Sequence, residues 1–475
     1  MNSNQCELDI PLKFANMLYE EMSIRHPNAF YLKRSQPKWD GKIHFINKNG
    51  YFKIGFLSRI YQRCIELGVK NLKVIDNRRE FKSVKPKVIK HIGKYELRKE
   101  QVQAISSILN SKVGNIPFYI GVTDLTVNFG KSLLMAALYY AFGKKLKTLL
   151  ITNDADWLRQ AKEEFKQYLP DETVTYVQGS KVNNWSNFSI GMIQSLSRNI
   201  RVYQRELTTI DMVLVDEADQ AGSKSYQSVL SHMYNTKVRI GLSGTIYMSK
   251  LKKDQLKNMN LESFFGQVLT QFKLKDSIKK GYSTNVVVKL VPFNKWFGNW
   301  ESEEIGYMGE YDSTITNNRN AWDMVYDRLI FNMAYGRLPA LVVCKYIKHC
   351  ENLYKYIKKK LEDRGLTISC VHVDTPTKLR KKIVSDFREG KIDILFSTTI
   401  LSRGKNFPLL KYMINAASMD SQEKSIQFLG RLVRTHVSKK KAVLDDLQYP
   451  GYYLSRHGKH RKRYYQNEGL KVIQL

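Results

Sequence analysis

Lys131 and Ser132 stand between a predicted strand (116–122) and a predicted helix (132–142), where side chains can bind phosphate. Backbone N–H groups at a helix N-terminus face a bound phosphate. An ammonium group there can reach the outer phosphate oxygens, and a hydroxyl can bind Mg²⁺. The residues expected to form this phosphate-binding loop are Asn128, Gly130, Lys131 and Ser132.

An acidic run downstream supports this site. The loop alone could be an ordinary helix start, because Leu125 and Asn128 occupy places where small residues are usual. Asp216-Glu217-Ala218-Asp219 follows the strand pattern 212–215. Acids at the carboxyl end of a parallel strand face the crevice in which α/β proteins bind ligands. There Asp216 can hold Mg²⁺ through its water shell, and Glu217 can polarise an attacking water. A solvated acidic loop is the alternative, but strand, acids and Gly-Lys-Ser occur in the order of a nucleotide-hydrolysing site.

Two arginines near the C-terminus could complete such a site. Hydrolysis of a γ-phosphate spreads negative charge over oxygens that a guanidinium fork fits. Arg431 and Arg434 are three apart and should share one helical face at the end of the predicted helix 423–433. If both reach the phosphate loop, the nucleotide sits between two domains that close on binding and open on hydrolysis, which is a motor. The alternative is a solvated basic face in a chain with 77 Lys and Arg residues.

The order of predicted elements indicates an α/β protein with more than one domain. A chain of 475 residues exceeds the roughly 250–300 that one core can serve. Strand-length apolar runs alternate with amphipathic helical patterns, which predicts parallel sheets. The expected strands are 148–152, 189–192, 212–215 and 238–242 in one block and 340–344, 367–372, 392–397 and 413–416 in the next. The expected domains are a small basic N-terminal α+β domain (1–92), a first α/β domain (93–292), a connecting segment (293–319), a second α/β domain (320–444) and a basic C-terminal extension (445–475).

Charge and composition favour a nucleic acid as the partner. The formal net charge is +33, and a polyphosphate backbone is the commonest cellular polyanion. A membrane surface is the rival anion, but no apolar run approaches the roughly 18–20 residues of a transmembrane helix. The N-terminus shows no signal-peptide pattern, so we expect a soluble, unexported protein. The five cysteines form no CxxC motif and resemble no zinc site, and Cys344 and Cys370, inside apolar runs, are expected to be buried thiols of a reducing cytoplasm.

Basic residues mixed with aromatic ones mark two segments for nucleic-acid binding. One is the N-terminal block, which includes Phe30-Tyr31-Leu32-Lys33-Arg34. The other is the run 456–465, in which Arg, Lys and His precede paired tyrosines. Such a mixture suits contacts to the phosphate backbone together with base stacking. A solvated tail with a loose electrostatic grip is the alternative for the second segment.

As an ordered set, these residues resemble the motifs of superfamily 2 helicases. The resemblance covers about 95–434 and implies two tandem RecA-like domains, ATP and Mg²⁺ as ligands, and a nucleic-acid substrate. It further implies that Gln101, with Arg98, orients the nucleotide, that Gly404 and Asn406 contact it, and that Arg431 and Arg434 act as arginine fingers. The matching segments are 97–101, 126–132, 149–153, 158–160, 193–196, 216–219, 242–245, 341–344, 397–399, 403–408 and 427–434.

The Asp-Glu-Ala-Asp tetrapeptide does not by itself indicate a DEAD-box RNA helicase. That family would show Ser-Ala-Thr where this chain has Ser243-Gly244-Thr245, and a histidine in the motif that here reads Gln427-Phe428-Leu429-Gly430-Arg431-Leu432-Val433-Arg434. The N-terminal block, with Pro27, Phe30 and 38–43, is instead similar to that of UvsW-type recombination helicases of bacteriophages. This resemblance implies action on branched DNA.

The resulting hypothesis is an ATP- and Mg²⁺-dependent DNA helicase or translocase for recombination, replication or repair. Its expected partners are branched DNA with single-stranded and duplex arms, and single-strand-binding or recombination proteins. The expected location is the cytoplasm, that of the host for a viral protein. The alternatives are an RNA helicase, a duplex DNA translocase subunit that does not separate strands, and a non-catalytic nucleic-acid-binding protein with a decayed ATP site.

Overall fold

The computed structural model describes residues 1, 4–78, 80, 84–180, 184–246, 252–293, 305–401 and 407–475. The chain divides into two compact units. The first unit comprises Met1–Leu125 and Phe129–Phe272, and the second comprises Thr126–Asn128 and Lys273–Leu475. Among the described residues, no helix combines the length and apolar character that crossing a membrane requires.

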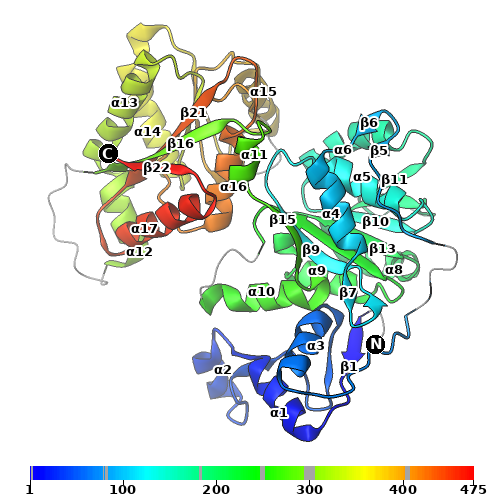
Figure 1. The fold of residues 1–475 in the computed structure, drawn as a ribbon. Coiled ribbons are helices and arrows are strands. Elements are labelled where there is room, and N and C mark those ends of the chain that lie inside the picture. Colours follow the sequence, from blue (N-terminus) through cyan, green and yellow to red (C-terminus); the bar gives the residue numbers. More distant parts are fainter. Residues whose placement is uncertain are drawn as a thin grey trace. The chain divides into compact units, whose positions relative to one another are not determined.

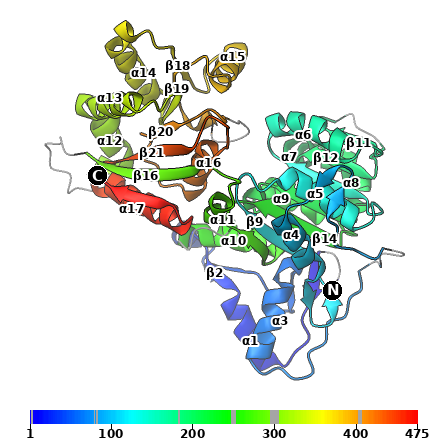
Figure 2. The ribbon, with the colours of Figure 1, turned by 45° about the horizontal axis from the view of Figure 1, so that its top comes forward.

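The first unit is built around a seven-stranded sheet in the order β11-β12-β10-β13-β14-β9-β15, and its strands pair in parallel. Figures 1 and 2 show helices around this sheet. Its elements are β5 (His91–Ile92), β6 (Tyr95–Glu96), α4 (Lys99–Leu109), β7 (Lys112–Val113), β8 (Ile116–Pro117), β9 (Ile120–Leu125), α5 (Lys131–Ala141), β10 (Thr148–Thr152), α6 (Ala155–Tyr168), β11 (Val174–Val177), β12 (Phe188–Met192), α7 (Ile193–Arg198), α8 (Ile200–Thr208), β13 (Met212–Asp216), η2 (Ala218–Gln220), α9 (Lys224–Ser231), β14 (Val238–Ser243), α10 (Lys252–Phe265) and β15 (Val268–Phe272).

The strands of this sheet are apolar at successive positions because both faces of the sheet are covered. Side chains of a strand alternate between the two faces. Val213 and Val215 share a core with residues of the helices α7 to α10. Leu214, which points to the opposite face, is equally buried. The continuous apolar runs of the sequence therefore mark central parallel strands, as expected for this sheet type.

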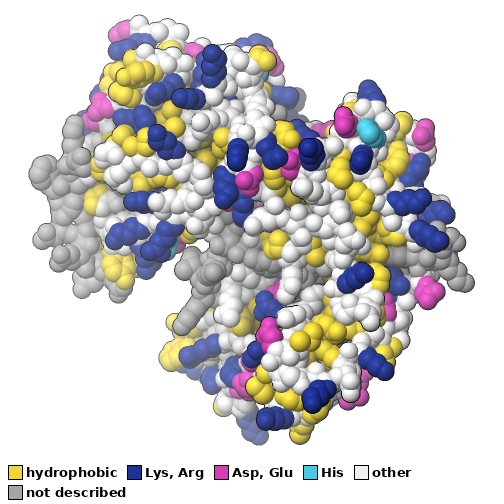
Figure 3. Space-filling model, viewed as in Figure 1, with side chains coloured by type: hydrophobic (Ala, Val, Ile, Leu, Met, Phe, Trp, Pro, Cys, Tyr) yellow, Lys and Arg dark blue, Asp and Glu magenta, His cyan; other side chains and the backbone are white. Residues whose placement is uncertain are grey.

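The N-terminal residues form a small α+β region within the first unit. Strands β1 and β4 pair antiparallel, as do β2 and β3. Lys and Arg side chains are scattered over the face of the molecule shown in Figure 3, with fewer Asp and Glu side chains. The elements are β1 (Gln5–Glu7), α1 (Leu12–Glu21), β2 (Ser23–Arg25), α2 (Ala29–Ser35), β3 (Lys42–His44), β4 (Tyr51–Lys53), η1 (Ile54–Phe56) and α3 (Leu57–Glu66).

This region is not a separate compact unit, which corrects the expected domain at 1–92. Its core joins Ile54 and Phe56 to Ile120 of β9 and Met259 of α10. The approach to α10 is close, because a Cβ on Gly55 would lie 1.9 Å from the backbone oxygen of Glu262. Apolar packing and this backbone contact attach the N-terminal region to the first sheet, so the contacts group it with that sheet.

The second unit contains another seven-stranded parallel sheet, in the order β18-β19-β17-β20-β21-β16-β22. The fold is therefore α/β with two tandem RecA-like sheets. The elements are α11 (Leu274–Lys279), β16 (Asn285–Pro292), α12 (Gly306–Tyr311), η4 (Asp312–Thr316), α13 (Arg319–Ala334), β17 (Ala340–Val343), α14 (Ile347–Lys360), η5 (Glu362–Arg364), β18 (Ile368–Val371), α15 (Thr377–Arg388), β19 (Ile394–Ser397), η6 (Thr399–Leu401), β20 (Tyr412–Asn415), α16 (Gln422–Leu432), β21 (Lys441–Gln448), α17 (Tyr452–Asn467) and β22 (Lys471–Gln474).

Strand β16 moves the expected boundary between the two α/β domains. We expected the first domain to run to residue 292, but the first unit ends at Phe272. Strand β16 pairs over its whole length with β21 and also with β22, so it belongs to the second sheet. The described part of the expected connecting segment, 305–319, forms α12 and η4 and contributes Tyr311 and Ile315 to the second core.

The expected C-terminal extension is also an integral part of the second unit. Strand β22 pairs with β16 at the edge of the sheet. Arg461 of α17 is fully buried and lies 2.8 Å from the Asp446 carboxylate of β21. The hydroxyl of Tyr465 donates to the same carboxylate at 2.7 Å. A buried charge needs such partners, so these contacts exclude a solvated tail for this half of the helix.

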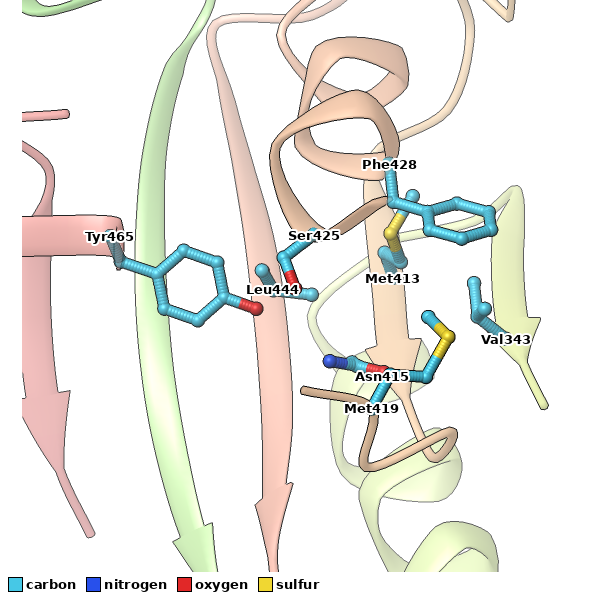
Figure 4. A pocket seen from close by; sticks show the side chains of 8 residues that line it. All are labelled: Val343, Met413, Asn415, Met419, Ser425, Phe428, Leu444 and Tyr465. Atoms are coloured by element: carbon cyan, nitrogen blue, oxygen red, sulfur yellow. The ribbon is translucent and has the colours of Figure 1, made fainter. Parts of the chain in front are cut away.

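A small cavity lies beneath α16 in the second unit (Figure 4). Its walls combine apolar side chains of the sheet, such as Leu444, with Phe428 of α16 and Tyr465 of α17. The space holds about one water molecule, so it is a packing gap and no nucleotide could enter it.

The second unit should lose stability on acidification through His349. Burial lowers the pKa of this histidine to about 3, and its Nδ1 lies 2.9 Å from the Tyr311 hydroxyl. An unfolded histidine titrates near 6.5, so between that pH and about 3 the unfolded chain binds more protons. The free energy of unfolding therefore falls as the pH falls through this range, by on the order of 5 kcal/mol in total.

Urea unfolding at several pH values between 7 and 4 measures this slope. His349→Gln should flatten it, whereas His436→Gln, a change outside the core, should leave it as in the wild type. If His349→Gln keeps the wild-type slope, another group causes the acid sensitivity.

Candidate active site

The order of strands in the first sheet brings the predicted catalytic segments to one edge. β14 lies between β13 and β9, and all three strands run parallel. Their carboxyl ends therefore lie at the same edge, where α/β proteins bind ligands. Asp216 ends β13, Ser243 ends β14, and α5 begins at Lys131 shortly after β9.

Gly130 shapes the start of α5. It has φ +85°, a left-handed conformation that favours glycine. Gln101 lies against it: its Nε2 donates to the carbonyl oxygens of Phe129 at 3.0 Å and Gly130 at 3.3 Å. A Cβ on Gly130 would come within 2.7 Å of this amide nitrogen. The glycine thus allows the close approach by which Gln101 holds the loop.

Gln101 is itself held by the first turn of α4. Its Oε1 accepts a hydrogen bond from the backbone N–H of Arg98, the N-cap residue of the helix, at 2.9 Å. With both ends of its amide engaged, the Gln101 side chain is oriented within the first unit. The structure brings Gln101 together with Arg98 and with the backbone of Phe129 and Gly130. Their contact with a nucleotide stays a prediction.

Lys131 and Glu217 meet across the strand ends. Lys131 Nζ lies 3.7 Å from Glu217 Oε1, and both side chains are partly exposed. Glu217 adopts a left-handed backbone conformation with φ 50°, which turns the chain sharply after the strand. A polar side chain in such a strained conformation is a common feature of active sites. An ammonium and a carboxylate at this distance can face a bound phosphate and the water that attacks it.

The carboxyl group of Asp216 is buried beside this pair. Burial, followed by the nearby Glu217 carboxylate, raises its pKa to about 7, although Lys131 acts in the opposite direction. Repulsion between adjacent carboxylates and desolvation both disfavour the ionised form. A divalent cation bound beside Asp216 would favour the ionised carboxylate instead, as expected of an acid that binds a metal.

Two residues outside the predicted site set also belong to this edge. Ser243 Oγ donates to Asp219 Oδ1 at 2.9 Å and lies 3.4 Å from Glu217 Oε2, so the end of β14 lies against both acids. Asp154, the N-cap of α6, raises the pKa of Asp216 further. The resemblance of 242–245 to a helicase motif pointed to Ser243, whereas no sequence signal pointed to Asp154.

Three of the predicted site residues belong to the second unit. Arg431 is buried near the end of α16. Arg434 lies beyond the end of this helix at Leu432, so the two arginines do not share a helical face as expected. Thr284 holds the chain there, because its N–H and Oγ donate to the carbonyl oxygens of Val433 and Arg434.

Asn128 is the third of these residues. It has a left-handed backbone with φ 64°, and within the second unit its Oδ1 accepts a hydrogen bond from Arg434 Nη1 at 2.6 Å. Gly404 and Asn406, which we expected to contact nucleotide, lie outside the described residues. The roles of all five residues with nucleotide stay predictions.

The groups at this edge of the first sheet suit a nucleoside triphosphate with a divalent cation. The glycine at the helix start keeps the approach to the loop free of a Cβ, and α5 presents its N-terminus there. Lys131 supplies positive charge, and Ser132 and Asp216 are the oxygen ligands that Mg²⁺ prefers. When bound, the metal would neutralise charge on the phosphate oxygens.

Two family models match the chain. Residues 94–248 match "Type III restriction enzyme, res subunit", and residues 325–436 match "Helicase conserved C-terminal domain". The first match contains the predicted phosphate loop and the acids Asp216 and Glu217. The second contains Arg431 and Arg434. The two models therefore divide between them the two halves of the predicted site.

Known proteins of similar sequence are helicases. The ATP-dependent DNA helicase UvsW of Enterobacteria phage T4 is 23% identical over 432 residues, which is 86% of this chain and 81% of that protein. A protein of Escherichia phage T5 named as a helicase is 23% identical over 397 residues, 80% of this chain and 82% of its own length.

A solved structure shows the same fold. It is a fragment assigned as the HsdR subunit of a type I restriction enzyme from Vibrio vulnificus, with TM-score 0.60 at 15% identity. The match covers 79% of this chain and 67% of that one.

Gln101→Ala should weaken binding of ATP more than it slows turnover. The substitution removes both hydrogen bonds to the loop, so the loop must become ordered when ATP binds. We expect KM for ATP to rise about tenfold, equivalent to roughly 1.4 kcal/mol, with a smaller change in kcat. Steady-state ATPase kinetics measure both. The matched control is Gln103→Ala, an exposed glutamine of the same helix. A loss confined to kcat would contradict a positioning role for Gln101.

The two family models fall in the order and at the places of the predicted motifs. The first unit brings Lys131, Asp216 and Glu217 to one sheet edge, and the second repeats the parallel-sheet architecture. This chain belongs to the superfamily 2 helicases and is an ATP hydrolase.

Proposed function

We propose that this protein is an ATP- and Mg²⁺-dependent DNA helicase or translocase that acts on branched DNA in recombination, replication or repair. The observation that carries the proposal is the cluster of Lys131, Asp216 and Glu217 at the carboxyl edge of the first sheet. The net charge of +33 supports a polyanionic substrate. The name of the phage T4 relative, a DNA helicase, supports DNA over RNA.

Each site residue has a defined task in this proposal. Lys131 binds the outer phosphates, while Ser132 and Asp216 hold Mg²⁺. Glu217 accepts hydrogen bonds from the attacking water and orients it, because its carboxylate is partly exposed beside Lys131. Ser243 holds Asp219 by donating a hydrogen bond to it and lies beside Glu217. The remaining proposed nucleotide contacts are Arg98, Gln101, Asn128, Gly130, Gly404, Asn406, Arg431 and Arg434.

Movement along DNA would follow from opening and closing of the nucleotide site. We propose that Arg431 and Arg434 complete the site when the ATP-bound form closes, and leave it after hydrolysis. The N-terminal region 1–92 supplies further basic surface for DNA. Single-strand-binding or recombination proteins are the proposed protein partners, and the cytoplasm, of a host for a viral protein, is the proposed location.

Lys131→Ala should abolish ATP turnover while DNA binding persists. Removal of the ammonium group takes away charge that stabilises the phosphate oxygens in the transition state, so kcat should fall by roughly 100-fold or more. DNA-stimulated ATPase and equilibrium DNA binding are measured in parallel. Lys112→Ala, which removes an exposed lysine of β7 in the same unit, is the control. Unchanged DNA-stimulated turnover in Lys131→Ala would reject the assignment of the site.

The choice of substrate can be tested by comparing ATPase stimulation across nucleic acids at one fixed salt concentration. We expect forked DNA and four-way junctions to stimulate more than linear duplex, and RNA to stimulate least. Salt must be fixed because backbone contacts make affinity strongly salt-dependent. Stimulation by RNA alone would indicate an RNA helicase instead.

A duplex DNA translocase is the second candidate, and the match to a restriction-enzyme family model favours it. Strand displacement on forked DNA separates the two candidates. A translocase of this kind would hydrolyse ATP on duplex DNA without separating the two strands.

A further inference from the structure

Helix α17 of the second unit has two faces of opposite character. Its inner face carries the buried residues Leu454, His457, Arg461 and Tyr465. The buried guanidinium of Arg461 also donates to the carbonyl oxygens of Met419 and Leu447, beside its ion pair with Asp446. This cation is therefore fully occupied by the protein and is unavailable to a ligand.

The outer face of the helix carries a row of cations. Arg456, Lys459 and Arg463 follow one another at helical spacings of three and four, so they lie on one face, and Lys462 lies beside them. All four side chains are exposed. The sequence of α17 contains no Asp or Glu. We call these four residues and Tyr452, one turn before Arg456, the α17 basic row.

The cations of the row are not neutralised by the part of the chain that the structure describes. Arg456 packs over the rings of Tyr452 and Tyr453 at 5.7 Å, and none of the four cations forms an ion pair or hydrogen bond with a described residue. The nearby Asp420 is already engaged by His460 at 2.9 Å and by the Tyr464 hydroxyl at 3.1 Å. Positive charge over α17 is visible in Figure 3.

The row is held rigidly at both ends. Glu310 of α12 is buried, and its carboxylate accepts the backbone N–H groups of Tyr453 and Leu454 at 2.7 to 3.1 Å. This carboxylate caps the first turn of the helix and complements its dipole. At the other end, β22 pairs with β16 directly after the helix. The cations therefore project from a fixed scaffold, which lowers the entropy lost when they bind a ligand.

From this geometry we propose that the α17 basic row binds the phosphate backbone of a single DNA strand. Successive cations lie about 4.5 and 6 Å apart along the helix axis, so a strand can place a phosphate near each of them. The ring of Tyr452, 42% exposed, stands at the end of the row and offers a stacking surface to an unpaired base. The inference rests on the proposed function for its choice of DNA.

The side chains between Arg456 and Arg463 argue against lipid tails or an apolar protein surface as the ligand. Between Arg456 and Arg463, the exposed residues of the helix are all cationic, so no apolar surface is present for lipid tails or a hydrophobic partner. The row also lies outside the segments that match the helicase family models, which end at residue 436. It would thus be an additional contact to the strand, made by the C-terminal part of the second unit.

Neutralising the row tests the proposal. The variant combines Arg456→Gln, Lys459→Gln and Arg463→Gln, and its affinity for a fluorescent thymidine oligonucleotide is measured without nucleotide at several salt concentrations. Loss of three phosphate contacts should raise Kd roughly tenfold and reduce the slope of log Kd against log salt by about 2. The matched control combines Lys355→Gln, Lys358→Gln and Lys359→Gln, three exposed lysines of α14 in the same unit.

The outcomes separate the proposal from its rivals. Unchanged affinity and salt slope in the α17 variant would overturn it, and so would an equal loss in the α14 control, because only net charge would then matter. Matching thermal unfolding midpoints show that the folds are intact. A loss of affinity seen only with duplex DNA would show that the row binds a duplex, and would overturn the proposal of a single strand. If wild-type protein binds the oligonucleotide but shows no DNA-stimulated ATPase, the proposed function fails. The role of the α17 basic row is still decided by the oligonucleotide affinity of its variant.

Discussion

The carboxyl group of Asp216, buried at the end of a central parallel strand, is the constraint on which the ATP site depends. Burial and the adjacent Glu217 carboxylate raise its pKa to about 7, and Lys131 offsets only part of this effect. In the proposed mechanism, Mg²⁺ bound with the nucleotide favours the ionised carboxylate, so metal binding and ionisation are coupled. A site built in this way has its full charge pattern only when its ligands are bound.

Parallel pairing lets one edge of the sheet collect residues from distant parts of the sequence. Asp216 and Ser243 end neighbouring strands, and the loop before Lys131 follows the next strand. Ser243 then connects the elements, since its hydroxyl donates to Asp219 and lies beside Glu217. A substitution at the end of β14 would therefore change the surroundings of both acids. The segments around Lys131, Asp216 and Ser243 are far apart in the sequence, and the pairing of their strands brings them together.

Regular, locally encoded elements of this protein could be predicted, and long-range pairings could not. The strand 148–152 was predicted with the bounds that β10 has, because a short apolar run flanked by turns suffices to define it. Strands β16 and β22 were missed, because their place depends on pairing with β21 and with each other. The sequence predicts α17 as part of a basic extension, because its many basic residues make its apolar inner face hard to recognise. Only burial shows that Arg461 belongs to the core and Arg463 to the surface.

By itself, the sequence determined the chemical parts of the site: a lysine and a serine at a helix start, a carboxylate pair after a buried strand, and the excess of positive charge. These follow from residue type and short-range order, which the chain carries locally. Tertiary structure alone decided which side chains meet: Gln101 against Gly130, Ser243 against Asp219, and Arg461 against Asp446. Such contacts depend on strand order and burial, which arise only when segments far apart in the chain pack together.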